Sequence, residues 1–289
     1  MAVIHRIRRI ALLSACAAFS IQACGGGDNS STTDASSDVS AQADAATGGD
    51  VTVSDGSVVD VVVDGPTKQP CTVSQDKIGY TNRTASGNPY VAYVPASYNP
   101  NVLTPLVIAL HGAGDTAMNY LSVIWQGNAD ADGFIVIAPE GTDPLGGGYT
   151  WDTTDVPLIL AAAVDVYNCY AVDWRKEIMH GFSAGGIMAY LIGLEKASLF
   201  SGISISSADL GSAEAVYGGS LLPSAWEIPV SHFHGTQDQN FPISYAITGM
   251  EELIEAGHPF YWHPFDGGHT TTAAFANTMY MDLKSYTAP

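Results

Sequence analysis

The hydrophobic positions of this chain change their pattern near residue 71. From Cys71 onward, short apolar and β-branched runs alternate with longer segments that repeat apolar positions every three or four residues. This alternation predicts an α/β fold in which helices cover both faces of a mostly parallel sheet. The expected strands are residues 90–94, 106–110, 134–138, 177–180, 203–206, 230–233 and 260–263, and the expected helices are residues 156–167, 184–195, 245–256 and 271–284.

Residues 25–70 lack this alternation. They consist largely of Ser, Thr, Ala, Asp and Gly, with one lysine and no aromatic residue. Such a segment cannot bury enough apolar surface to offset the conformational entropy lost on folding. We therefore predict a disordered acidic linker at residues 25–70, followed by one folded domain at residues 71–289.

The first 24 residues resemble an export signal. Three arginines precede an apolar run at residues 10–19, which is too short to span a bilayer comfortably but has the length of a signal-peptide core. The run leads to Ile21-Gln22-Ala23-Cys24-Gly25, which resembles a bacterial lipobox. This interpretation makes residues 1–24 a lipoprotein signal and Cys24 the lipid attachment site, with the anchor as the sole membrane contact. An ordinary secretory signal is the alternative, and both predict export.

The net charge excludes one class of partner, and the cysteines suggest a disulfide. The formal net charge is −19 with ten basic residues, so the chain would repel a phosphate backbone, and nucleic acid is excluded as a partner. If Cys16 leaves with the signal and Cys24 is acylated, Cys71 and Cys169 remain. In an oxidising compartment this pair predicts a disulfide. We expect a monomer.

Residues 181–185 form a Gly-x-Ser-x-Gly motif centred on Ser183. An expected strand precedes the motif and a helix rich in small residues follows it, which is the context of a nucleophile elbow. Gly181 and Gly185 leave room for the strand and the helix to approach each other. The pattern predicts that Ser183 is a nucleophile.

The elbow resembles that of the α/β-hydrolase family, and the resemblance covers the chain from about Cys71 to its end. It implies that a carboxylate follows a later strand and that a histidine follows a strand later still. Residues 233–238 leave a strand and resemble the acid-bearing loop, so Asp238 is the expected acid. Asp266 is its competitor.

The segment 265–270 follows the last expected strand and contains His269 after two glycines. The glycines let the backbone turn so that the imidazole can lie over the edge of the sheet. We expect His269 to be the general base, since a serine hydroxyl becomes a strong nucleophile only when a neighbour accepts its proton. Four other histidines compete and are interpreted as structural, namely His232, His234, His258 and His263.

An acyl-transfer site also needs two backbone N–H groups for the oxyanion. By position in the family pattern these are Ala184, after the nucleophile, and Ala113, in the loop after an earlier strand, with Gly114 as the alternative to Ala113. His111 is expected to support this loop. Neither a zinc-type Cys/His spacing nor a phosphate loop is found, so we expect no cofactor and no metal.

A closer resemblance is to the feruloyl esterases, acetylxylan esterases and short polyhydroxybutyrate depolymerases related to carbohydrate esterase family 1. It rests on residues 110–112, 151–156, Cys169 with residues 172–173, and residues 181–186. Residues 270–272 depart from it, because many depolymerase-like relatives have Trp-Pro-Gly after the histidine and this chain has three threonines. That difference makes the resemblance a weaker argument for a polyester substrate.

The resemblance implies an exported or surface-anchored serine esterase that acts through an acyl-enzyme on feruloyl or acetyl esters of a plant polysaccharide such as xylan. A domain of about 220 residues leaves little sequence for a large lid, so we expect an open cleft. Trp151, Tyr149 and Phe241 are the expected substrate-binding aromatics, and Trp262 is a further one. The alternatives are a polyester depolymerase, a catalytically inactive polymer-binding relative, and a peptidase.

Overall fold

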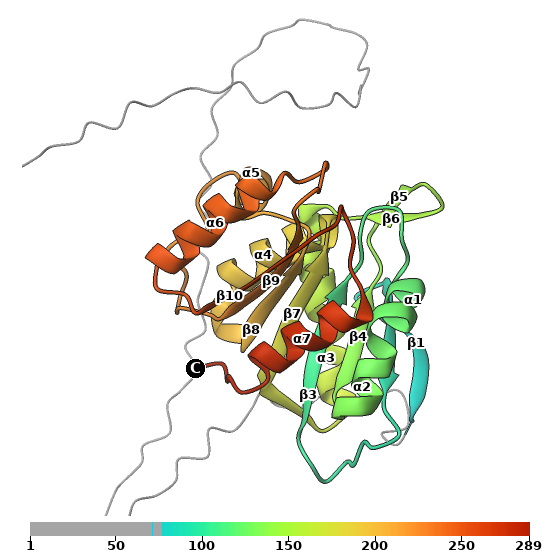
Figure 1. Ribbon diagram of the computed structural model, residues 1–289. Helices are drawn as coiled ribbons and strands as arrows, with labels where there is room; N and C mark the ends of the chain where they lie inside the picture. Colours follow the sequence, from blue (N-terminus) through green and yellow to red (C-terminus); the bar gives the residue numbers. More distant parts are fainter. Residues whose placement is uncertain (1–70, 72–76) are drawn as a thin grey trace, which may run out of the picture. The chain divides into compact units, whose positions relative to one another are not determined.

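An eight-stranded sheet forms the centre of the folded domain (Figure 1). The computed structural model describes residue 71 and residues 77–289, so the expected signal, the linker and Cys24 lie outside the described residues. The strand order is β1-β2-β4-β3-β7-β8-β9-β10. Strand β2 runs antiparallel to both of its neighbours, and the other pairings within the sheet are parallel. The sheet strands are β1 (Gly79–Ala85), β2 (Asn88–Val94), β3 (Thr104–Leu110), β4 (Ile135–Pro139), β7 (Val172–Phe182), β8 (Gly202–Ser206), β9 (Val230–Gly235) and β10 (Phe260–Phe265).

Helices cover both faces of the sheet, and each face has its own apolar core. The strand side chains alternate between the two cores: Leu106 and Ile108 of β3 enter one core, whereas Val107 enters the other. The first core is closed by α3 (Val156–Cys169), α4 (Ala184–Glu195), α5 (Leu210–Tyr217) and α6 (Ile243–Glu255). The second is closed by α1 (Ala117–Tyr120), the π-helical turn η1 (Leu121–Trp125), α2 (Gln126–Asp132) and α7 (Ala273–Leu283).

All seven expected strands and all four expected helices are present, and the expected bounds of α4 agree with those observed. The sequence analysis did not identify β1, the segment from α1 to α2, α5, or the hairpin of β5 (Asp143–Leu145) and β6 (Gly148–Thr150). These elements are short or polar. Strand β1 consists of Gly79–Ala85 and buries every second residue at its end, because it pairs with β2 at the sheet edge.

A disulfide joins Cys71 to Cys169, the last residue of α3, as expected. It encloses β1 to β6 in one covalent loop, since 98 positions separate the two cysteines. Arg83 of β1 lies beside this bond and forms an ion pair of 2.6 Å with Asp165. Within the described range, none of the helices is long and apolar enough to cross a membrane.

Candidate active site

Ser183 lies at a sharp turn between the end of β7 and the start of α4. Its φ of 55° is in the region that non-glycine residues rarely adopt. Strand and helix can meet at this angle because Gly181 and Gly185 lack side chains. A Cβ at Gly181 would lie 2.0 Å from the Gly185 carbonyl oxygen, and a Cβ at Gly185 would lie 2.3 Å from the Leu110 carbonyl oxygen. This geometry exposes the serine hydroxyl above the carboxyl end of the sheet.

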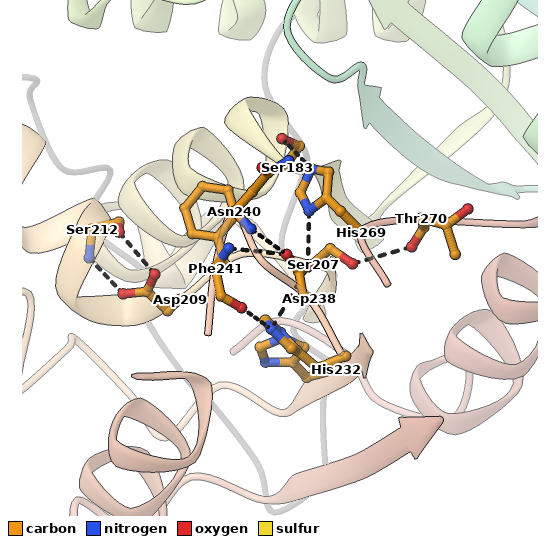
Figure 2. Close-up of polar contacts among 11 residues, drawn as sticks. Ser183, Ser207, Asp209, Ser212, His232, Asp238, Asn240, Phe241, His269 and Thr270 are labelled. Atoms are coloured by element: carbon orange, nitrogen blue, oxygen red, sulfur yellow. Dashed lines mark hydrogen bonds and ion pairs between the residues drawn. The ribbon is translucent and has the colours of Figure 1, made fainter. Parts of the chain in front are cut away.

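The structure brings Ser183, His269 and Asp238 together although they come from three separate loops (Figure 2). His269 Nε2 lies 2.8 Å from Ser183 Oγ, and His269 Nδ1 lies 2.8 Å from Asp238 Oδ2. A carboxylate can only accept, so it holds the proton of His269 on Nδ1 and leaves Nε2 free to accept the serine proton. This arrangement is suited to activating the hydroxyl as a nucleophile.

The Asp238 side chain is fully buried but well satisfied by donors. Burial alone would raise the pKa of its carboxyl. The Phe241 N–H, the His269 imidazole and the Asn240 N–H counter this effect and hold the pKa below its ordinary value. Both N–H groups lie 2.9 Å from Oδ1. Asp238 therefore stays ionised and can stabilise a positive charge on His269.

The loop after β3 runs next to the serine. A Cβ placed on Gly112 would lie 3.5 Å from Ser183 Cβ. The Gly114 N–H is already bonded to the Tyr149 carbonyl at 2.8 Å, so it is not available to an oxyanion. In the described part of the chain, no acceptor is bonded to the N–H of Ala113 or of Ala184. The geometry thus favours Ala113 over Gly114 as the partner of Ala184.

His111 belongs to this loop, and its Nδ1 lies 2.8 Å from the Gly112 carbonyl oxygen. It is fully buried, and its Nε2 lies 3.3 Å from Glu140 Oε1. Trp151 Nε1 donates to the His111 carbonyl at 2.8 Å, and the two rings pack with centroids 4.6 Å apart. Trp151 therefore borders the expected oxyanion loop. Tyr149 approaches the same loop through its backbone, by its bond to Gly114.

Two phenylalanine rings contact the His269 imidazole. The Phe241 ring stacks on His269 with centroids 5.6 Å apart, and the Phe182 ring lies 5.0 Å from it. Phe241 was an expected substrate-binding residue, whereas Phe182 was not identified as a site residue, although it is the first variable position of the Gly-x-Ser-x-Gly motif. Trp262 packs against His232 and His234 instead.

The competing acid and the other histidines have different partners. Asp266 is exposed and accepts a hydrogen bond from Gln237 Nε2 at 2.6 Å. His263 pairs with Asp282 at 2.7 Å, and His258 Nδ1 lies 2.8 Å from the Ile228 carbonyl oxygen. His232 and His234 are fully buried, and His234 Nε2 lies 3.9 Å from Asp238 Oδ2.

Ser207 is a further site residue that the sequence analysis did not identify. It follows β8, its φ is 51°, and its hydroxyl donates to the carbonyl of Thr270, which follows His269 (Figure 2). No sequence motif marks Ser207, because its hydrogen-bond partner Thr270 is distant in the chain. No group of three or more His, Cys, Asp or Glu among the described residues could hold a metal ion.

Comparison with known proteins finds similarity to esterases. Residues 160–287 match the family model described as phospholipase/carboxylesterase. Feruloyl esterase C of Emericella nidulans is 29% identical over 199 residues, covering 66% of this chain and 62% of the relative. A bifunctional acetylxylan esterase/xylanase of Neocallimastix patriciarum is 29% identical over 164 residues, covering 55% of this chain and 22% of the relative. The chain thus spans less than two thirds of the length of these curated relatives.

Solved structures show the same fold. A crystal structure of esterase PE8 has a TM-score of 0.55 at 21% identity, covering 71% of this chain and 100% of that chain. A ferulic acid esterase has a TM-score of 0.52 at 18% identity, covering 72% and 96%. Among residues 77–289 no large lid is evident, as expected. The chain is therefore an α/β-hydrolase-fold protein that shares sequence with feruloyl and acetylxylan esterases.

Proposed function

We propose that this protein is a serine esterase that cleaves carboxylic esters through an acyl-enzyme. The single observation that carries the proposal is the continuous hydrogen-bonded arrangement of Ser183, His269 and Asp238, with both links at 2.8 Å. Ser183 Oγ attacks the ester carbonyl carbon while His269 Nε2 takes the hydroxyl proton. His269 then gives that proton to the departing alcohol oxygen, and the C–O bond breaks. Water activated by the same imidazole releases the carboxylic acid.

The N–H groups of Ala184 and Ala113 would hold the oxygen that becomes negative in each tetrahedral intermediate. Loss of one such donor typically costs on the order of a hundredfold or more in rate. Buried, ionised Asp238 favours the imidazolium that forms in the same step. Of the aromatic side chains beside the site, Phe241 and Trp151 would contact the ring of a sugar or of a phenolic acid.

The substrate class is proposed to be feruloyl or acetyl esters on a plant polysaccharide. The relatives named feruloyl esterase and acetylxylan esterase support this class. The second candidate is a polyester, because a poly(3-hydroxybutyrate) depolymerase of Ralstonia pickettii is 30% identical over 135 residues, covering 40% of this chain and 28% of the relative. The three threonines after His269 favour the first class.

A substrate panel tests the proposal. Purified full-length protein is assayed with p-nitrophenyl acetate, methyl ferulate, acetylated xylan, polyhydroxybutyrate and a peptide anilide. We expect turnover of the small ester and of at least one polysaccharide-type ester, with none in the matched Ser183→Ala variant. Turnover of the anilide but of no ester, or equal turnover by the variant, would contradict the proposal.

We further propose that the protein acts outside the cytoplasm as a monomer attached by a lipid on Cys24. The arginines and the apolar run before Cys24 support this placement. Mass spectrometry of protein extracted from a bacterial membrane should give an N-terminal peptide that begins with acylated Cys24. A Cys24→Ala variant should appear in the soluble fraction with unchanged ester turnover. A native N-terminus without a lipid would contradict the anchor.

A further inference from the structure

A chain of three buried side chains lies beneath the catalytic acid and has no part in the proposed mechanism. The Tyr190 hydroxyl lies 3.0 Å from His232 Nδ1, and His232 Nε2 lies 3.1 Å from His234 Nδ1. His234 Nε2 lies 2.8 Å from the Phe241 carbonyl oxygen. Figure 2 shows that His232 is on the side of Asp238 away from His269. We call Tyr190, His232 and His234 the histidine relay.

The Phe241 carbonyl oxygen, at the end of the histidine relay, determines which nitrogen of each neutral imidazole carries the proton. A carbonyl oxygen can only accept, so His234 Nε2 carries a proton and donates it to Phe241. In the neutral imidazole, His234 Nδ1 is then an acceptor and His232 Nε2 must donate to it. His232 Nδ1 in turn accepts from the Tyr190 hydroxyl. Burial, and then the nearby His234 and His263, hold the pKa of His232 well below its ordinary value, which keeps this ring neutral.

Phe241 connects the relay to the catalytic groups. Its N–H donates to Asp238 Oδ1 at 2.9 Å, its carbonyl accepts from His234, and its ring stacks on the His269 imidazole. His234 Nε2 also lies 3.9 Å from Asp238 Oδ2. Rotation of the backbone at Phe241 would therefore move the N–H that donates to Asp238 and the ring that stacks on His269.

We propose that His234 is a positioning residue: its hydrogen bond to the Phe241 carbonyl holds residues 238–241 so that Asp238 keeps the His269 imidazole in its productive orientation. The relay supplies the correct tautomer of His234 and excludes water, because all three of its side chains are buried. This inference rests on the proposed esterase function.

Two isosteric substitutions separate positioning from packing. The side-chain nitrogen of glutamine reaches about as far as imidazole Nε2, whereas that of asparagine reaches only as far as Nδ1. His234→Gln should therefore keep the bond to Phe241 and retain kcat within about threefold. His234→Asn should lose the bond and lower kcat by roughly 10- to 100-fold, with KM changed less than about threefold, since small displacements of catalytic groups cost rates of this size.

Proton NMR gives a readout that general destabilisation of a folded variant would not produce. The Nδ1–H of His269, bonded to Asp238, should give a strongly downfield resonance in the wild type and in His234→Gln. The resonance should shift upfield or broaden in His234→Asn. Thermal unfolding of all three proteins is the control for folding. Wild-type kcat and an unchanged resonance in a folded His234→Asn variant would overturn the proposal, and so would equal losses in both variants.

If His234→Asn does not fold, Tyr190→Phe tests the far end of the relay, because it removes only the donor to His232 Nδ1. We expect kcat to fall by about three- to tenfold with the same direction of NMR shift, and no change in either would overturn the proposal. Absence of ester turnover in the wild type would be a failure of the proposed function. The His269 resonance would still decide the role of His234.

Discussion

Two carboxyl groups near opposite edges of the sheet lie in opposite surroundings. Glu177 is in the middle of β7, paired with Leu106 near the start of β3, and it lines an apolar cavity of about 380 Å³ together with Trp174 and Phe200. Burial and the neighbouring Asp173 raise the pKa of Glu177 to about 8. Asp238, on the loop that follows the carboxyl end of β9, is fully buried, yet its pKa is lowered.

The difference lies in the donors that each group receives. Two backbone N–H groups and an imidazole converge on Asp238, so burial strengthens its interactions instead of neutralising it. No described residue donates a hydrogen bond to the Glu177 carboxyl. Burial therefore produces an ionised functional group at one end of the sheet and a largely neutral, destabilising one at the other. Variants at the carboxyl end should change turnover, and variants at the other end should change stability.

The largest effect is expected for Ser183→Ala. Removal of the nucleophile should lower kcat for p-nitrophenyl acetate by roughly 10⁵-fold, because the remaining groups act mainly through the serine. The unfolding temperature should stay within about 2 °C of the wild type, since a partly exposed hydroxyl is lost and no core packing changes. A large loss of stability in this variant would contradict the expectation that changes at the carboxyl end of the sheet affect turnover alone.

Asp238→Asn should follow, with kcat lowered by about 10³- to 10⁴-fold. The neutral amide can donate a hydrogen bond to His269 Nδ1, which favours the tautomer with its proton on Nε2, and this tautomer cannot accept the serine proton. Steady-state kinetics measure the loss, and circular dichroism checks that the fold is unchanged. If the matched variant Asp266→Asn lost as much activity, the assignment of the acid would be wrong.

Loss of the disulfide should lower stability and leave activity unchanged, the opposite of the two preceding variants. Replacing both Cys71 and Cys169 by serine should lower the free energy of unfolding by about 3 to 4 kcal/mol, because a bond that closes a loop of this length restricts the unfolded chain strongly. Activity at 25 °C should be retained, since Cys169 precedes the amino end of β7, whereas Ser183 follows its carboxyl end. Denaturant unfolding with and without reductant measures the effect.

The smallest effect is expected for Glu177→Gln. The folded-state pKa of Glu177 lies above its unfolded value, so the protonated form is favoured by folding, and its contribution to stability falls as pH rises from about 5 to 8. Glutamine removes this dependence. The loss of unfolding free energy between pH 5 and pH 8.5 should shrink by about 2 kcal/mol, discounted for partial exposure. An unchanged pH profile of unfolding would show that Glu177 is already solvated.

The sequence by itself determined the class of fold and the order of the site residues. The apolar runs are buried on both sides, so each strand read as a short continuous run, and the Gly-x-Ser-x-Gly motif marked the turn at Ser183 because only glycine allows the close approach at positions 181 and 185. The position of Asp238 and His269 after later strands followed from the family order. Residues 79–85 were missed because an edge strand need not be apolar.

Only the tertiary structure decided how these residues cooperate. The bond from Gly114 to Tyr149 excludes one oxyanion candidate, and it depends on a hairpin 35 positions away in the chain. Ser207 and His234 carry no motif, since their partners, Thr270 and Phe241, are brought to them by neighbouring strands and loops. Sequence patterns report local conformation and burial. Hydrogen bonds between distant loops arise only when the parallel strands align their carboxyl ends at one edge of the sheet.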